Sequence, residues 1–361
     1  YEMQMCRTGK INGVNYQDSL FRGIEVDGDS VDSDKIQFER ALVNSQISNI
    51  LKQARYTHTV VAFCYTLFSV VKSAFCLRKG DVLILQYPLK KYYTFVCNVA
   101  HWRGCKVVTL IHDLGCFRSK RLTVSQEISR LNHSDSIIVH SEAMKEWLEK
   151  KGIKAKLQIL EIFDYLSANR QGTEIKSLGL GPGRPYRVMF AGVLASCHND
   201  FLYQMANAPR SYELIFYGSG FEPDRLHAEV NFKGFVSSDD LIATAEGDFG
   251  IVWYGPALEG GKGPLGEYLQ YNAPHKMSLY IRCGLPVIIW EKAGLSSFVR
   301  DNKIGICISS LEELEDVFTR MTVEEYQEMK RNVKKIDDRL SRGFYTFEAI
   351  KRACADLDIF F

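Results

Sequence analysis

The sequence lacks the motifs that identify several common protein classes. Its 10 cysteines include no Cys-x-x-Cys pair and no Cys/His cluster with the spacing of a zinc finger. The first half has no Gly-x-Gly-x-x-Gly motif and the whole chain has no Gly-x-x-x-x-Gly-Lys-Ser/Thr motif, which argues against a dehydrogenase and a P-loop NTPase. Several cysteines lie in apolar runs and no signal peptide is visible, so we expect reduced, buried thiols in a cytosolic protein.

Charge of one sign and long apolar runs are also scarce. Lys and Arg total 45 against 43 for Asp and Glu, a net charge of +2, so the chain lacks the basic excess of a nucleic-acid-binding protein. The most apolar stretch, 60–71, is shorter than the roughly 20 residues that span a bilayer. A buried helix is the simpler interpretation of this stretch, and an interfacial membrane contact is the alternative.

What the sequence does contain is an alternation of short apolar runs with helical segments. In the first half this pattern indicates a parallel sheet that is covered on both faces. Ligands of such sheets bind beyond the carboxyl ends of the strands. The apolar runs are 82–88, 106–113, 134–141 and 155–165, and the polar residues that end the first three are Gln86, His112, Asp113, His140 and Ser141.

A second alternating series follows a stretch rich in glycine, proline and charged residues. It predicts a second α/β half of similar size, so the 361 residues divide into two Rossmann-like domains with a binding cleft between them. We place the N-terminal domain at 1–168, an exposed linker at 169–186, the C-terminal domain at 187–335, and a C-terminal helix that crosses back to the first domain at 336–361.

The segment 271–290 carries the strongest functional signal. Pro274 stands at or just before a helix start, where its missing N–H costs nothing. His275 and Lys276 then lie in the first helical turn, where unpaired backbone N–H groups, the helix dipole and the lysine charge all favour an anion. A diphosphate fits such a site. A surface lysine at a helix start, with no ligand, is the alternative.

This segment resembles the donor-binding segment of two-domain (GT-B) sugar-nucleotide glycosyltransferases. More narrowly, it is similar to the bacterial group that contains galactofuranosyltransferases and the glucosyltransferases that extend glycans of serine-rich adhesins. The residues that carry the resemblance, spaced as N-x-x-H-K-x-S and G-x-P-V, are Asn272, His275, Lys276, Ser278, Gly284, Pro286 and Val287. Three further stretches fit, at 249–253, 111–114 and 342–346, and the resemblance covers roughly 81–352.

The resemblance implies a GT-B fold with the acceptor on the N-terminal domain and a UDP-sugar donor on the C-terminal domain. It places the UDP phosphates at the lysine, and it places uracil and ribose near 217–218 and 233–236. For the glycines and aromatic residues in this set, a purely structural role is the alternative. The donor-binding residues that the resemblance implies are Lys276, His275, Asn272, Ser278, Gly192, Tyr217, Gly218 and Phe235.

Transfer of a sugar also requires that the acceptor hydroxyl lose a proton while the departing diphosphate is stabilised. Asp113 with His112, at the end of a first-half strand, is our candidate for the base, and Asp113 acts alone or orients His112. His140, at the end of the next strand, is the second candidate. Arg118 is a candidate for binding the acceptor. Strand-end residues with structural roles are the alternative for each.

Retaining members of this fold often carry Glu-x7-Glu, and that signature is missing here. Leu279 stands where the second glutamate is expected, which favours inversion by direct displacement. Glu259 and Glu267 have the right offset, but they lie in a glycine-rich loop, so we interpret their spacing as coincidence. This loop, 255–270, is interpreted as either a lid over the donor or a disordered insertion.

The sequence therefore predicts a glycosyltransferase that moves galactofuranose or glucose from a UDP-sugar to a hydroxyl of a glycan or glycolipid, in the synthesis of a surface polysaccharide or glycoprotein. We expect no cofactor and no metal, because no Asp-x-Asp motif stands where a metal would be held. We also expect a cytoplasmic protein, and leave its association with the inner face of the membrane and its homo-oligomerisation open. The alternatives are a UDP-sugar epimerase of the same fold and an inactive glycosyltransferase-like binding partner.

Overall fold

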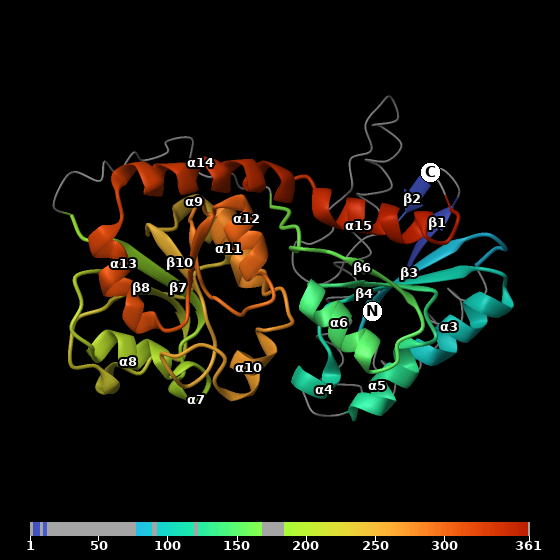
Figure 1. Ribbon diagram of the computed structural model, residues 1–361, viewed down its shortest axis with the longest axis horizontal. Helices are drawn as coiled ribbons and strands as arrows, with labels where there is room; N and C mark the ends of the chain where they lie inside the picture. Colours follow the sequence, from blue (N-terminus) through green and yellow to red (C-terminus); the bar gives the residue numbers. More distant parts are fainter. Residues whose placement is uncertain are drawn as a thin grey trace, which may run out of the picture. The chain divides into compact units, whose positions relative to one another are not determined.

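The computed structural model contains two compact units, each built around one sheet (Figure 1). It describes residues 77–88, 92–118, 122–167 and 184–359, together with two short strands near the amino terminus. The first unit falls within 1–139, 145–160 and 343–361, and the second falls within 140–144 and 161–342. One short segment, 140–144, therefore belongs to the second unit although the chain on both sides of it belongs to the first.

Some expectations fall on residues outside this description. The apolar stretch 60–71 and most of the expected linker 169–186 are among them. Within the described ranges, no helix is both long enough and apolar enough to cross a bilayer. The C-terminal region is helical, as predicted, in the form of α14 (Val323–Leu340) and α15 (Phe344–Ala355) with an interruption between them.

The first unit contains a six-stranded sheet in the order β2-β1-β3-β4-β5-β6. The four apolar runs form parallel strands, as predicted: β3 (Val82–Tyr87), β4 (Lys106–Ile111), β5 (Ser136–Val139) and β6 (Lys156–Ile159). Two strands that the sequence pattern does not predict, β1 (Met3–Arg7) and β2 (Lys10–Asn12), add an antiparallel hairpin at the edge of β3. The helices of this unit are α3 (Tyr93–Trp102), α4 (Gly115–Arg118), α5 (Val124–Leu131), most of α6 (Glu142–Lys150), and α15, which packs against β5 and β6.

The second unit contains a six-stranded parallel sheet in the order β12-β11-β10-β7-β8-β9. The chain first builds one side of this sheet and then the other, so the strand order reverses between β7 and β10, which is where open α/β sheets bind ligands. The strands are β7 (Arg187–Val193), β8 (Glu213–Ser219), β9 (Asn231–Gly234), β10 (Phe249–Val252), β11 (Val287–Trp290) and β12 (Gly305–Ile308). The two sheets confirm the predicted α/β class with two Rossmann-like domains.

Helices surround this sheet (Figure 1). They are α7 (Ser196–Asn199), α8 (Phe201–Asn207), α9 (Ser238–Thr244), α10 (Gly263–Tyr268), α11 (His275–Arg282), α12 (Ser296–Asn302), α13 (Leu314–Arg320) and α14, with short 3-10 turns at Pro223–Arg225 and Leu311–Glu313. Buried apolar side chains from the strands, α8 and α13 form the core beneath them.

Helix α11 is held close to the sheet by specific contacts. A Cβ at Gly250 of β10 would lie 2.4 Å from the Tyr280 ring, so the glycine gives the helix room to approach the strand. The Tyr280 hydroxyl accepts a hydrogen bond of 2.8 Å from the backbone N–H of Ala191 in β7. A buried ion pair between Arg282 and Asp337 ties the end of α11 to α14. These contacts fix the carboxyl-terminal half of α11 against β7, β10 and α14.

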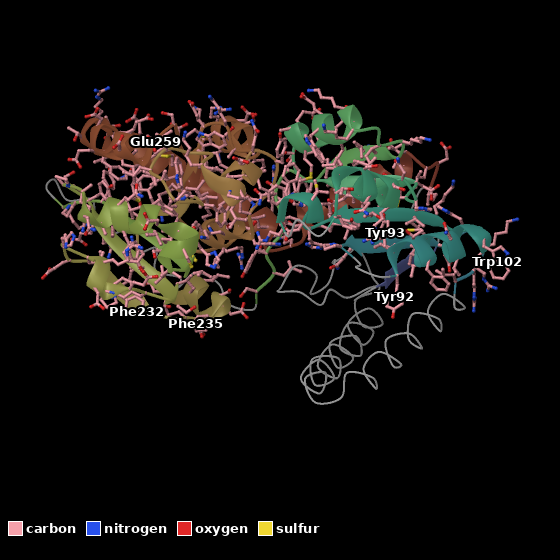
Figure 2. All side chains as sticks on the ribbon, turned by 90° about the horizontal axis from the view of Figure 1, so that it is seen from below. Tyr92, Tyr93, Trp102, Phe232, Phe235 and Glu259 are labelled. Carbon is pink, nitrogen blue, oxygen red and sulfur yellow. The ribbon has the colours of Figure 1, made fainter. Side chains whose placement is uncertain are left out.

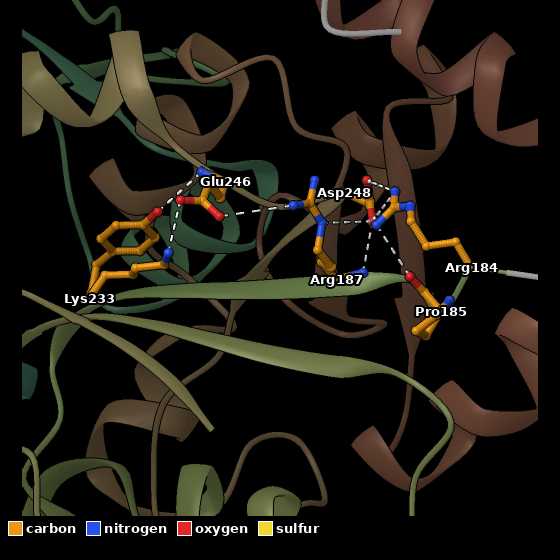
Figure 3. A network of polar contacts seen from close by, with 7 residues as sticks. Arg184, Pro185, Arg187, Lys233, Glu246 and Asp248 are labelled. Atoms are coloured by element: carbon orange, nitrogen blue, oxygen red, sulfur yellow. Dashed lines mark hydrogen bonds and ion pairs between the residues drawn. The ribbon is translucent and has the colours of Figure 1, made fainter. Parts of the chain in front are cut away.

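A network of ion pairs joins the amino ends of β7 and β10 (Figure 3). Asp248, which is 3% exposed, accepts hydrogen bonds of 2.8 Å from the backbone N–H of Arg187 and 2.9 Å from the guanidinium of Arg184. Nearby, the carboxylate of Glu246 lies 2.9 Å from the ammonium of Lys233 in β9. A buried carboxylate needs such partners. The network joins β7 and β10 at their amino ends, and the pair of Glu246 with Lys233 connects them to β9.

The glycine-rich loop at 255–270 is more regular than its sequence indicates. It contains α10, and a backbone bridge joins Glu259 to Ser310. Gly260 and Gly261 lie against the indole of Trp290, because a Cβ at these positions would fall 2.0 and 2.4 Å from ring atoms. The interpretation of this loop as a disordered insertion is therefore wrong. Its glycines are required by close packing on Trp290 rather than by disorder.

Candidate functional site

The predicted anion-binding lysine lies at the point where the strand order of the second sheet reverses. Lys276 is the second residue of α11, and its Nζ lies 3.5 Å from the ring centroid of Phe190 in β7. The same Nζ lies 4.8 Å from the ring centroid of Tyr254, which follows β10. A Cβ on Gly192, near the end of β7, would lie only 3.3 Å from it. The structure thus brings Lys276 and Gly192 together, as the sequence predicts.

The charge of Lys276 is held by aromatic rings and not by a carboxylate. Burial around its ammonium group lowers its pKa to about 7. No carboxylate within the described ranges pairs with this group, whose close contacts are the faces of Phe190 and Tyr254. Aromatic faces attract a cation but do not neutralise it. The site is therefore electropositive, and the amino end of α11 adds to this potential.

Asn272, in the turn before α11, provides a polar group that has no partner in the described part of the chain. Its side chain is 8% exposed, and its Oδ1 has no hydrogen-bond partner among the described residues. A buried acceptor without a partner is unfavourable unless a ligand donates to it. Its neighbour Ala273 is held in place by a 3.0 Å hydrogen bond from its N–H to Nδ1 of His140. Asn272 therefore occupies a fixed turn beside Lys276.

Three residues of the predicted site, two of them buried beneath this turn, contact Phe163. His140 is fully buried, its Nδ1 accepts the Ala273 N–H, and its ring lies edge-on to Phe163 at 4.9 Å. Ser278 is also fully buried, and its hydroxyl donates a 2.6 Å hydrogen bond to the carbonyl of Phe163. His275 is exposed, and its imidazole stacks on the ring of Phe163, with 4.5 Å between the ring centroids. His140 and Ser278 support the site from below, which favours a structural role for them over that of a base or a ligand contact.

The predicted uracil and ribose region has a mixed outcome. Gly218 has φ of +141°, and a Cβ there would lie 1.7 Å from the carbonyl oxygen of Gly192, so the glycine is required where β7 and β8 approach each other. Tyr217 is 5% exposed, and its hydroxyl accepts a 3.1 Å hydrogen bond from the N–H of Glu246. Phe235 is 78% exposed after β9, on the same side of the unit as Phe232 (Figure 2). Of the three predicted residues in this region, Tyr217 and Gly218 serve the packing of the sheet, whereas Phe235 presents its side chain to solvent.

The turn after β7 is occupied by a protein carboxylate. Glu222 accepts hydrogen bonds of 2.9 Å from the N–H and 2.8 Å from the hydroxyl of Ser196, the first residue of α7. These hydrogen bonds lower the pKa of Glu222, so it remains ionised. Because a negative charge already caps α7, an anionic ligand is favoured at α11 instead. Sequence reasoning identified neither Glu222 nor the two aromatic residues around Lys276.

In the first unit, Asp113 follows β4 and lies near Arg118. The Oδ2 of Asp113 is 3.8 Å from Nε of Arg118 in α4, so the two residues that we predicted separately are neighbours. Burial raises the pKa of Asp113, while Arg118 lowers it and Glu127 raises it. The backbone N–H of His112 donates a 2.8 Å hydrogen bond to the carbonyl of Tyr87, which ties the turn to the end of β3. A carboxylate with a raised pKa is suited to accept a proton.

Within the described ranges, no group of His, Cys, Asp and Glu side chains could hold a metal ion. In the second unit, Lys276 and the amino end of α11 together offer positive charge to an anion.

Comparisons with known proteins match both halves of the chain. The glucosyltransferase 3-like N-terminal domain matches residues 36–162, and the glucosyltransferase 3-like C-terminal domain matches 188–353. The β-1,6-galactofuranosyltransferase WbbI of Escherichia coli K12 is 29% identical over 283 residues, which is 78% of this chain and 81% of WbbI. Glucosyltransferase 3 of Streptococcus gordonii is 26% identical over 274 residues, which is 74% of this chain and 77% of that protein. Among solved structures, a glycosyltransferase from Rickettsia africae matches with a TM-score of 0.48 and 10% identity, over 81% of this chain and 80% of that one.

Proposed function

Because the chain belongs to the glucosyltransferase 3-like family and is a glycosyltransferase, we propose that it transfers a hexose from a UDP-sugar to a hydroxyl of a glycan. The observation that carries the proposal is the position of Lys276. Its ammonium group lies at the reversal of the strand order, 3.5 Å from the ring centroid of Phe190, and no carboxylate of the described residues neutralises it. A diphosphate supplies the negative charge that this site lacks.

Lys276 would stabilise the leaving group of the reaction. When the bond between the sugar and UDP breaks, negative charge develops on the diphosphate, and a fixed cation at that position lowers the barrier. The amino end of α11 would act in the same direction. Asn272 Oδ1, which is buried and lacks a partner among the described residues, would accept a hydrogen bond from a hydroxyl of the donor. His275 and Gly192 border the same position, and Phe235, which directly follows β9, is an exposed aromatic residue that could contact the uracil.

Asp113 would receive the proton of the acceptor hydroxyl. Its raised pKa favours proton uptake, and the nearby Arg118 guanidinium would bind an acceptor oxygen or keep Asp113 ionised before the reaction. Direct attack by the activated hydroxyl on the anomeric carbon inverts its configuration. Leu279 stands where retaining members of this fold often carry a glutamate, which supports inversion. The charge of Lys276 and the helix end makes a metal unnecessary for the departure of UDP.

The relatives suggest which sugars should be tested first. The Escherichia coli relative is a galactofuranosyltransferase and the Streptococcus gordonii relative is a glucosyltransferase, so we propose galactofuranose or glucose as the transferred sugar. We propose a glycan acceptor of a surface polysaccharide or glycoprotein. Incubation with the donor alone separates this function from that of an epimerase, which would change the sugar and release no UDP.

The proposal is tested by nucleotide binding to the wild-type chain and to two lysine variants. UDP, GDP, ADP and NAD are compared by thermal shift, and the dissociation constant of UDP is then measured by calorimetry. We expect UDP to raise the unfolding temperature and GDP, ADP and NAD to leave it unchanged. We expect Lys276→Ala to weaken UDP binding by about 10- to 100-fold, because a charged hydrogen bond contributes roughly 1.5–3 kcal/mol. Lys292→Ala is the matched control, since Lys292 is an exposed lysine of the same unit. Unchanged UDP affinity in Lys276→Ala would show that the phosphate assignment is wrong.

A further inference from the structure

Glu127 is a buried carboxylate for which the proposed reaction has no direct role. It lies on α5, its side chain is 0% exposed, and it accepts three hydrogen bonds. The Tyr87 hydroxyl donates to Oε1 at 2.9 Å, the N–H of Gly115 donates to Oε1 at 2.6 Å, and the N–H of Cys116 donates to Oε2 at 2.7 Å. Tyr87 ends β3, while Gly115 and Cys116 begin α4 directly after the turn that carries Asp113. One carboxylate therefore joins three elements of the first unit.

These contacts fix the conformation of the turn. Hydrogen bonds to an ionised carboxylate are shorter and stronger than those between neutral groups. Gly115 is part of the fit, because a Cβ at this position would lie 3.3 Å from Oε1 of Glu127. Without the carboxylate, two backbone N–H groups and a buried tyrosine hydroxyl would lose their acceptor, and each such loss is unfavourable in a buried site. The turn would then be free to adopt other conformations.

We propose that Glu127 is a positioning residue for glycosyl transfer, whose carboxylate holds the turn between Asp113 and Arg118 in the conformation that activates the acceptor. The inference rests on the proposed function, because it takes Asp113 as the group that receives the acceptor proton. Glu127 itself is fully buried and both of its oxygens are engaged, so it acts through the turn and not by touching a substrate.

The charge of Glu127 gives the turn a second property that can be measured. Burial raises the pKa of Asp113, Arg118 lowers it, and the negative charge of Glu127 raises it. Replacing Glu127 with a neutral residue therefore lowers the pKa of Asp113, whereas a purely structural contact would leave it unchanged. The titratable and charged groups around the turn are Arg118 and Cys116 of α4, Glu127 and Arg130 of α5, Tyr87 of β3, and His112 beside Asp113.

The test compares Glu127→Gln with Tyr87→Phe. The rate of UDP release from UDP-galactofuranose and from UDP-glucose is measured from about pH 5 to about pH 9, with octyl glycosides as acceptors, and thermal unfolding is recorded for each variant. We expect Glu127→Gln to lower kcat by about tenfold or more and to move the acid limb of the profile to lower pH by about half a unit to one unit, with little change in KM for the donor. Tyr87→Phe removes one hydrogen bond but keeps the charge, so we expect a smaller loss of kcat and an acid limb at the wild-type position.

The outcomes separate this inference from the proposed function. If both variants lose kcat only in proportion to their lost thermal stability, and the acid limb does not move, Glu127 is merely structural and the inference is overturned. Asp113→Asn is measured in the same assay. If Asp113→Asn keeps its kcat, the assignment of the base is wrong and the role of Glu127 falls with it. If Glu127→Gln does not fold, Glu127→Asp keeps the charge with a shorter reach, and we expect a lower kcat with an unmoved acid limb.

Discussion

The two units differ in the neighbours that they provide for Lys276 and for Asp113. In the second unit, the ammonium of Lys276 lies between the rings of Phe190 and Tyr254, and no carboxylate of the described residues pairs with it. In the first unit, the carboxylate of Asp113 has Arg118 at 3.8 Å and is influenced by Glu127 as well. One charge is left without a counterion, and the other is surrounded by charges of both signs.

Burial has the same effect in both places, and the neighbours make the difference. Desolvation favours the neutral form of any group, so it lowers the pKa of Lys276 and raises the pKa of Asp113. At Lys276 the faces of Phe190 and Tyr254 oppose this effect only in part, and in our proposal an anionic ligand supplies the rest. At Asp113 the protein supplies both a cation and an anion, so the proton affinity is set before a substrate arrives. In the proposed function this difference is useful, because the lysine site would be completed by its ligand, whereas the proposed base would be tuned in advance.

The comparison predicts that UDP binding depends on pH through Lys276, and this is the largest effect that we expect. The pKa of Lys276 without ligand is about 7, so the group is protonated below this pH and increasingly neutral above it. Because a diphosphate binds the protonated form, the dissociation constant of UDP should rise by more than about tenfold between pH 7 and pH 9. Calorimetry across this range measures the change. Lys276→Arg is the control, since a guanidinium stays charged, and its UDP affinity should be nearly flat with pH. A flat profile in the wild-type chain would contradict the contrast between the two sites.

A smaller effect is expected when one wall of the lysine site is changed. Phe190→Leu removes the aromatic face that lies 3.5 Å from Nζ of Lys276 but keeps an apolar side chain in the core. A cation–π contact contributes roughly 0.5–2 kcal/mol, so we expect UDP affinity to fall by about 2- to 30-fold. Phe201→Leu is the matched control, because Phe201 packs against Phe190 and is equally buried. Both variants should lose stability, and Phe190→Leu alone should lose affinity. Equal affinities in the two variants would mean that the ring only fills space.

The sequence predicts the elements well and the contacts between them poorly. Apolar runs, proline and glycine locate the parallel strands and the start of α11, because these signals are local. They do not reveal that Phe190 and Tyr254 surround Lys276, since these residues meet only when β7, β10 and α11 pack together. Glu127 is similarly hidden, because an acidic residue in the first turn of a helix normally faces solvent.

Local sequence signals also assigned to the site two residues whose contacts in the fold are structural. His140 ends a strand and Ser278 shares a first-turn motif with Lys276, so both are reasonable candidates for chemistry from their sequence positions. In the folded chain, His140 accepts a hydrogen bond from the N–H of Ala273, and Ser278 donates one to the carbonyl of Phe163. Both side chains therefore belong to the packing below the site. The direction in which a side chain points along a helix or after a strand depends on such distant partners.

The smallest effect is expected at Ser278, and it tests whether a residue of the motif can be purely structural. Ser278→Ala removes the 2.6 Å hydrogen bond to the carbonyl of Phe163, which leaves a buried acceptor without that donor. We expect the free energy of unfolding to fall by about 1–2 kcal/mol, as measured by urea denaturation, while UDP affinity changes less than about twofold. Ser296→Ala, at another buried serine of the same unit, serves as the control for loss of a buried hydroxyl. A tenfold loss of UDP affinity in Ser278→Ala alone would return Ser278 to the donor site, and Lys276 would then share its role with the protein hydroxyl two residues away.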